Sequence, residues 1–219
     1  MGSEVFTKHP PHSEFGGRKV LNIGCGWAQY PAPNVVNVDA YGQPDLRWDL
    51  RVTPLPFESG TVDLILANHI MEHLPVEKWW ALFEDFARML KVGGEVEIYV
   101  PGDGADSVFG YRDHVSMINA CSFYGTFGTY RSLTNAWATD NAKSPANWLK
   151  STHRIDYLQD KWWLKGPNWW KLWCRTHLRN VVAEQGFFFR KVTPEEMAEE
   201  ETKIQKRATR APFVASQAG

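Results

Sequence analysis

The sequence predicts an α/β protein with a doubly wound, mostly parallel sheet and helices on both faces. Two observations carry this prediction. Four apolar runs typical of buried strands, at residues 19–23, 35–38, 62–66 and 95–100, are separated by turn-forming or helical segments, as in a sheet with crossover connections. The chain has 219 residues, of which 43% are hydrophobic, so it can bury one sizeable core.

The first apolar run leads into Gly24-Cys25-Gly26, where glycine lets the backbone approach another group closely. The second run ends on Asp39, whose carboxylate suits two ribose hydroxyls. A lone Gly-x-Gly is a weak signal because ordinary turns also use glycine. Taken in chain order, however, the turn and the acid predict a nucleoside pocket.

The clearest helix is predicted at residues 76–90, between the third and fourth apolar runs. Its large apolar side chains recur at intervals of three and four residues, at Trp79, Phe83, Phe86 and Leu90. A glycine follows shortly after as a stop signal. We therefore expect this helix to pack on the sheet.

The regular pattern is lost after Pro101-Gly102. It returns in a second helical run at residues 169–185 and a closing strand at 187–192. Residues 103–168 are too long for an ordinary connection, so we expect them to form an inserted substrate cap. The core would then comprise residues 18–102 and 169–192.

The two ends of the chain are predicted to lie outside this core. Residues 1–17 have the composition of a flexible leader. Thr193-Pro194-Glu195-Glu196 has the order of a capping box, so a C-terminal helix should start there and lead into a tail within residues 193–219.

Composition narrows the classes of function. The formal net charge is -1, so no global field attracts nucleic acid or membranes. Three widely spaced cysteines argue against a disulfide framework and for a reducing compartment. No apolar run approaches the ~20 residues that cross a bilayer, and no signal pattern is present at the start. We expect a cytoplasmic protein without a membrane partner.

Six features in order resemble the class I S-adenosylmethionine-dependent methyltransferases, in particular the type 11 group. They are the glycine turn, Asp39 at a strand end, Asp49-Leu50 after a further short strand, Pro54-Leu55-Pro56-Phe57 before Val62-Asp63, Met71-Glu72-His73-Leu74, and the passage from Met89 to Ile98. The resemblance covers about residues 18–102. It implies a Rossmann-like fold in which the strand at 95–100 is the fifth, so that the predicted cap follows the fifth strand.

The resemblance also implies the cofactor, S-adenosyl-L-methionine. The glycine turn would pass under its methionine portion, Asp39 would accept hydrogen bonds from its ribose, and Asp49 with Leu50 would border its adenine. The cofactor-binding residues implied in this way are Asn22, Gly24, Cys25, Gly26, Asp39, Ala40, Asp49, Leu50, Asn68 and His69. Two features depart from the family pattern: Asn22 stands where many relatives have an acid, and the third glycine is missing.

His69-Ile70-Met71-Glu72-His73 matches the inverted zinc-protease pattern. Because it follows a buried strand in the order of a methyltransferase, where similar sequences use these residues as a wall of the site, we expect no metal. His69 lies at the carboxyl end of a strand, where open α/β sheets place reacting groups. It is a candidate catalytic base, with a purely pocket-shaping role as the alternative.

The expected cap supplies the other candidates. We expect His114, His153 and Arg154 to face the sulfonium end of the cofactor, the histidines as catalytic groups and the arginine as a ligand of the acceptor. Residues 143–180 carry five lysines and three arginines against two aspartates, and six of the eleven tryptophans. Three of these, at 169, 170 and 173, are expected to form the buried face of a helix, whereas Trp162 or Trp163 would stack on the acceptor.

Two classes of acceptor remain open. The first is a polar small molecule methylated on oxygen or nitrogen. The second is RNA or a modified nucleotide bound by the basic, tryptophan-rich segment. DNA base methylation is disfavoured because Asn68-His69-Ile70 lacks the Pro-Pro-aromatic sequence of the exocyclic-amine enzymes and no Pro-Cys pair occurs. A subunit that binds the cofactor without catalysis is a third possibility.

Overall fold

The computed structural model of this chain describes residues 5–6, 15–118, 122, 149–158, 162–196, 198–199 and 202. The strands are β1 (Val5–Phe6), β2 (Val20–Ile23), β3 (Val35–Asp39), β4 (Leu46–Arg47), β5 (Val62–Asn68), β6 (Leu90–Pro101), β7 (Leu149–Leu158) and β8 (Val182–Lys191). The helices are α1 (Val76–Met89), α2 (Asp106–Gly110) and α3 (Asn168–His177), with short 3-10 turns η1 (Met71–His73) and η3 (Trp162–Lys165).

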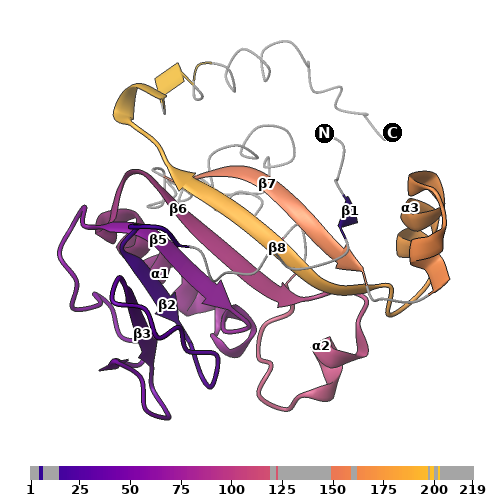
Figure 1. The fold of residues 1–219 in the computed structure, drawn as a ribbon, viewed down its shortest axis with the longest axis horizontal. Coiled ribbons are helices and arrows are strands. Elements are labelled where there is room, and N and C mark those ends of the chain that lie inside the picture. Colours follow the sequence, from indigo (N-terminus) through magenta and orange to yellow (C-terminus); the bar gives the residue numbers. More distant parts are fainter. Residues whose placement is uncertain are drawn as a thin grey trace, which may run out of the picture.

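These strands form one sheet in the order β1-β7-β8-β6-β5-β2-β3-β4 (Figure 1). Neighbouring strands pair in parallel except for β8, which is antiparallel to both β6 and β7. The predicted α/β fold with a mostly parallel sheet is therefore confirmed. Because seven strands point the same way, their carboxyl ends share one edge, and the connections that leave this edge can form a site.

Helix α1 covers one face of the sheet and begins and ends close to where the apolar periodicity predicts (Figure 1). Its side chains Leu82, Phe83 and Phe86 are fully buried in the main core. On the opposite face, within the described residues, Phe15, Tyr30 and Ala32 pack on the sheet from connections rather than from a helix.

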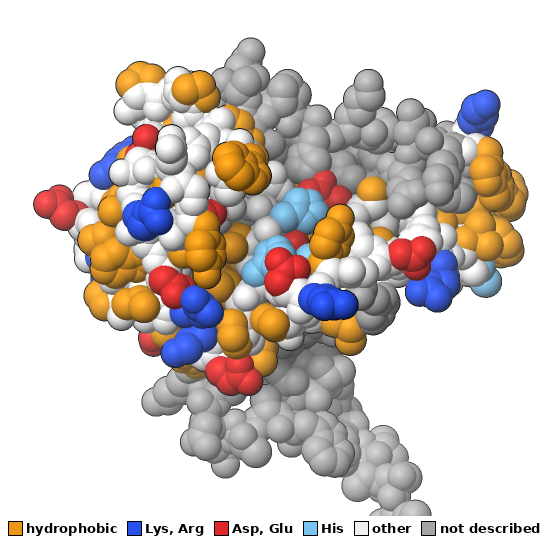
Figure 2. Space-filling view, turned by 90° about the horizontal axis from the view of Figure 1, so that it is seen from below, with side chains coloured by type: hydrophobic (Ala, Val, Ile, Leu, Met, Phe, Trp, Pro, Cys, Tyr) orange, Lys and Arg blue, Asp and Glu red, His pale blue; other side chains and the backbone are white. Residues whose placement is uncertain are grey.

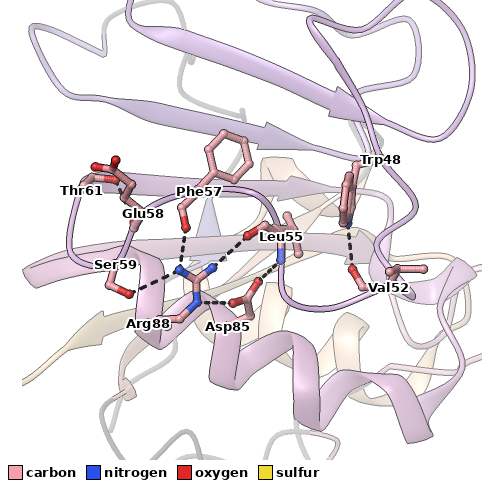
Figure 3. Close-up of polar contacts among 9 residues, drawn as sticks. All are labelled: Trp48, Val52, Leu55, Phe57, Glu58, Ser59, Thr61, Asp85 and Arg88. Carbon is pink, nitrogen blue, oxygen red and sulfur yellow. Dashed lines mark hydrogen bonds and ion pairs between the residues drawn. The ribbon is translucent and has the colours of Figure 1, made fainter.

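A partly buried ion pair fixes the loop before β5 to α1 (Figure 3). Asp85 accepts hydrogen bonds from the backbone N–H of Leu55 at 2.6 Å and from Nε of Arg88 at 2.6 Å. Arg88 also donates to the carbonyls of Phe57 and Leu55 at 2.6 and 3.0 Å. This Asp85–Arg88 clamp gives a loop without regular structure a defined path.

Two predicted boundaries are wrong. Strand β7 lies inside the expected cap, because its backbone pairs antiparallel with β8 and so belongs to the sheet. The second helix ends at His177 rather than at residue 185. Asn180 has a positive φ of 57°. Its side-chain oxygen accepts a hydrogen bond from the N–H of Asp106, and its side-chain nitrogen donates one to the Asp106 carboxylate. The chain therefore turns at Asn180, and β8 can start.

The predicted capping box is present at Thr193 and Glu196. Glu196 N–H donates to Thr193 Oγ1 at 3.1 Å, and Thr193 N–H donates to Glu196 Oε2 at 3.1 Å, which is the reciprocal pattern of a capping box. Residues 1–4 and 7–14 of the expected leader, and 119–121, 123–148 and 159–161 of the expected cap, lie outside the described residues. Among the described helices, none has both the length and the apolar character needed to span a bilayer.

Candidate functional site

The glycine turn after β2 packs directly against the segment that follows β5. Gly24 has a positive φ of 63°, and its N–H donates to the carbonyl of Val38 at 2.8 Å. A Cβ atom at Gly24 would overlap the side chain of Ile70. Only glycine therefore fits here, and its close approach places the turn beside His69 and Ile70.

Asp39, at the end of β3, is held by two turns. Its Oδ2 accepts the N–H of Gly26 and its Oδ1 accepts the N–H of Tyr41, both at 2.8 Å. Each carboxylate oxygen keeps a further lone pair for a ligand hydroxyl. The neighbouring aromatic side chains of Trp27 and Tyr41 are 98% and 74% exposed, which is unusual for such large apolar groups. Neither side chain was predicted as part of the site, although an aromatic residue directly after a glycine turn is a signal in the sequence.

Asn22 lies beneath the turn and is 1% exposed. Its Nδ2 donates to Asn37 Oδ1 and to the carbonyl of Ala28, both at 2.9 Å. Both amide hydrogens are thus used within the protein. Asn22 shapes the turn from below and has no donor left for the cofactor.

The residues expected near adenine lie in different surroundings. Asp49 is paired with Arg51 through contacts of 2.7 to 3.1 Å, and the Arg51 hydrogen bonds lower the pKa of that carboxyl. Leu50 is 4% exposed and belongs to the core, whereas Ala40 is partly exposed. Cys25 is buried. Its burial, and to a lesser extent the negative charge of Asp39, raises the pKa of its thiol to about 11. That cysteine is therefore a neutral thiol at physiological pH.

His69 follows β5 at the carboxyl edge of the sheet, with a positive φ of 50° that is rare outside glycine. Its Nε2 lies 2.8 Å from Glu184 Oε1 and its Nδ1 lies 3.1 Å from Glu72 Oε1. Burial on its own would lower the pKa of His69, but the hydrogen bonds and charges of Glu184 and Glu72 raise it to about 9. The ring is therefore protonated at neutral pH and bridges two carboxylates. The side-chain oxygen of the preceding Asn68 is buried without a partner among the described residues.

Glu72 was noted in the sequence only as part of the histidine–glutamate–histidine pattern, and Glu184 was not predicted. Glu184 lies near the start of β8, which begins at this edge because it is antiparallel to its neighbours, and Glu72 comes from η1. Glu72 is only three residues from His69, whereas nothing local in the sequence marks Glu184 as its partner.

His114 lies beside η1. The backbone N–H groups of Val115 and Ser116 donate to the carbonyl of Glu72 at 2.9 and 3.0 Å, which holds this segment against η1. The ring of His114 lies 4.8 Å from that of His73, edge to face. Its catalytic role remains a prediction.

His153 and Arg154 are not in a cap. They lie in β7, where their backbones pair with Phe188 and Phe187. Asn68, the last residue of β5, pairs with Tyr99 of β6. Tyr99 pairs with Gly186 of β8, and Gly186 pairs with Ile155 of β7. His153 therefore lies two residues before this row of paired residues, inside the sheet. The side chains of His153, Arg154 and Trp163 are outside the described part of the structure.

The tryptophans of α3 do not form a buried face, although Trp170 is partly buried and packs on the cluster of Cys174, Val181 and Val182. Trp169 and Trp173 are 70% and 42% exposed, and Trp162 of η3 is 55% exposed. The rings of Trp170 and Trp173 stack at 5.2 Å, and Trp173 stacks on His177 at 4.8 Å. The expectation of a buried face is wrong because the helix buries Cys174 instead.

Figure 2 looks onto the carboxyl edge and shows histidine and acidic side chains gathered in a hollow of the surface. The glycine turn, Asp39 and His69 lie at or directly after the ends of β2, β3 and β5, whose carboxyl ends share this edge. Such a crevice at the carboxyl ends of parallel strands is where α/β sheets bind nucleotide ligands.

Comparison with known proteins agrees with this geometry. Residues 35–98 match the model of a family described as a methyltransferase domain. A search of curated proteins gives no match to the chain.

Several solved structures are similar. A SAM dependent methyltransferase from Archaeoglobus fulgidus covers 80% of this chain and 87% of its own at a TM-score of 0.54 and 12% identity. The N-methyltransferase NodS from Bradyrhizobium japonicum, in complex with S-adenosyl-L-homocysteine, covers 78% and 76% at a TM-score of 0.42 and 12% identity. A putative S-adenosylmethionine dependent methyltransferase from Listeria monocytogenes covers 82% and 92% at a TM-score of 0.47 and 12% identity. The family match over residues 35–98 and the shared fold show a methyltransferase domain in this chain, with the glycine turn and the acid after β3 at the carboxyl edge of its sheet.

Proposed function

We propose that this methyltransferase transfers the methyl group to an oxygen or nitrogen of a polar small molecule that binds beside His69. One observation carries the proposal: His69 stands at the carboxyl end of β5, fixed between Glu72 and Glu184, in the segment that packs on the cofactor turn. The two described cysteines are free and buried, which supports a reducing, cytoplasmic location.

The reaction mainly requires positioning. The bond from the acceptor to the methyl carbon forms as the sulfur–carbon bond breaks, so the enzyme must hold both at near-attack distance. The His69 side chain is 45% exposed, so one side of its ring can contact an acceptor while its nitrogens hold the two carboxylates. The acceptor's proton leaves to a nearby base, for which the Glu184 carboxylate is the candidate.

A nucleic-acid acceptor is the second candidate. The exposed Trp169 and the stack of Trp170, Trp173 and His177 offer a platform of the kind that holds successive bases. Figure 1 shows α3 beyond the carboxyl end of β7, on the far side of the sheet from β2 and β3. An acceptor that used this platform would have to extend across the edge to reach the cofactor turn.

A methyl-transfer screen that detects S-adenosyl-L-homocysteine tests the proposal. A library of polar hydroxyl and amine compounds and a set of RNA oligonucleotides would be compared. With the compound found, His69→Gln should lower kcat/KM by about 100-fold, the effect of misplacing a reacting group. Trp173→Ala is the matched control and should leave small-molecule transfer unchanged.

The same variants separate the two acceptor classes. Transfer to oligonucleotides only, with salt-sensitive binding that Trp173→Ala abolishes, would establish the nucleic-acid alternative. Full activity of His69→Gln would contradict the proposed acceptor position.

A further inference from the structure

We propose that Glu72, His73 and His114 form a binding site for a divalent transition-metal ion of the zinc class, with at least one coordination position open. The site lies at the carboxyl edge of the sheet, next to His69. The proposal goes beyond the methyl-transfer function and does not depend on the identity of the acceptor.

The three side chains converge. Each offers one ligand atom, and these atoms all lie within 4.8 Å of one another. The side chain of Glu72 is 3% exposed. Its Oε1 faces His69, while its Oε2 is buried without a hydrogen-bond partner among the described residues. A buried, unpartnered carboxylate oxygen is unfavourable, and a cation bound there would satisfy it.

Both histidines are oriented as metal ligands usually are. His73 Nδ1 lies 3.2 Å from the carbonyl of Asp113 and 3.3 Å from its carboxylate. His114 Nδ1 lies 3.3 Å from the carbonyl of Val108. Since a carbonyl only accepts, each Nδ1 carries the hydrogen and each Nε2 keeps a free lone pair. Outer hydrogen bonds of this kind fix the tautomer and ring orientation of metal-ligating histidines.

The backbone holds the two halves of the site together before any ion binds. Val115 and Ser116 donate their N–H groups to the carbonyl of Glu72, and Ser116 Oγ donates to the carbonyl of Leu74 at 2.7 Å. These bonds set the segment that carries His114 against η1, which carries Glu72 and His73. Little reorganisation is then needed to contract the three ligand atoms around an ion.

This ligand set differs from the one that the inverted zinc-protease pattern suggested. His69 cannot pair with His73 on one ion, because both of its nitrogens already contact carboxylates. The expectation that the protein binds no metal rested on the local sequence pattern alone. That pattern does not include His114, which the fold brings close to Glu72 and His73. Two imidazoles and one carboxylate with an open position are a ligand set of catalytic zinc sites, whereas magnesium prefers oxygen ligands.

Zinc titration of the full-length chain tests the site without any methyl acceptor. Bound metal would first be removed from the protein with a chelator. One sample would then be titrated with zinc chloride by calorimetry. A parallel sample would be titrated with cobalt(II) and followed by visible absorption. We expect saturable binding of one ion per chain, ligand-field bands of a nitrogen and oxygen site for cobalt, and no competition by millimolar magnesium.

Variants assign the ligands. His114→Ala should weaken zinc binding by at least about 10-fold, the effect that even an outer hydrogen-bond partner has. His177→Ala, which removes a histidine from α3 outside the cluster, should bind as the wild type does. The proposal is overturned if the wild type shows no saturable binding or no ligand-field bands, if magnesium competes equally, or if His114→Ala and His177→Ala behave alike. The wild-type cobalt spectrum does not depend on the folding of any variant, and none of these results bears on methyl transfer.

Discussion

Replacing Asp85 by alanine should lower the free energy of unfolding by about 3 kcal/mol, the sum of the two interactions estimated below. Asp85 is 4% exposed and accepts two hydrogen bonds, from the backbone of Leu55 and from Arg88 (Figure 3). Both would be lost in the variant. The loop before β5 would also lose part of its connection to α1.

The magnitude follows from the two contacts. Leaving the buried N–H of Leu55 without a partner costs about 1–3 kcal/mol, and a hydrogen bond between charged groups contributes about 1.5–3 kcal/mol. The side chain of Arg88 is 32% exposed, so solvent screens its part and the lower end of that second range applies. For a domain of this size, a loss of about 3 kcal/mol corresponds to a fall in Tm of roughly 6–12 °C.

Urea denaturation followed by circular dichroism measures this difference. Glu84→Ala is the matched control because Glu84 is exposed on the same helix, and its effect should stay within about 0.5 kcal/mol. If Asp85→Ala costs less than about 1 kcal/mol, or no more than the control, then the clamp does not stabilise the fold and the reasoning from buried, charged hydrogen bonds fails here.

Three further predictions concern the turn, the ribose acid and a surface ion pair. Asp39→Ala should weaken binding of S-adenosylmethionine by about 1.5–3 kcal/mol, measured by calorimetry, and an unchanged affinity would contradict the assigned role. Gly24→Ala should weaken cofactor binding because its methyl group overlaps Ile70; combining it with Ile70→Ala should restore part of the affinity, and no recovery would refute the steric explanation. The Lys91 hydrogen bond to Asp63, at 2.6 Å, lowers the pKa of Asp63 below its ordinary 3.8. Asp63→Asn should therefore be less stable than the wild type at neutral pH, and the difference should vanish as pH falls through the lowered pKa; thermal unfolding curves with no such convergence would contradict it.

The sequence by itself determined the features that depend on local pattern. Periodicity placed α1 almost to the residue, because the apolar stripe of a helix repeats within one element. The apolar runs placed β2, β3, β5 and β6, and the order of Thr193 and Glu196 predicted a capping box that the structure shows. The glycine turn and Asp39 could likewise be predicted from the sequence, because a positive φ and an acid at a strand end are properties of single positions.

The tertiary structure alone decided which distant groups meet. It brought Glu184 from an antiparallel strand to His69, and His114 to Glu72 and His73, through backbone pairings that no local pattern encodes. It also placed β7 in the sheet rather than in a cap, because a strand is defined by its partner as much as by its own composition. Charge and hydrogen bonding act through space, so the chemistry of His69 follows from neighbours that the order of residues does not reveal.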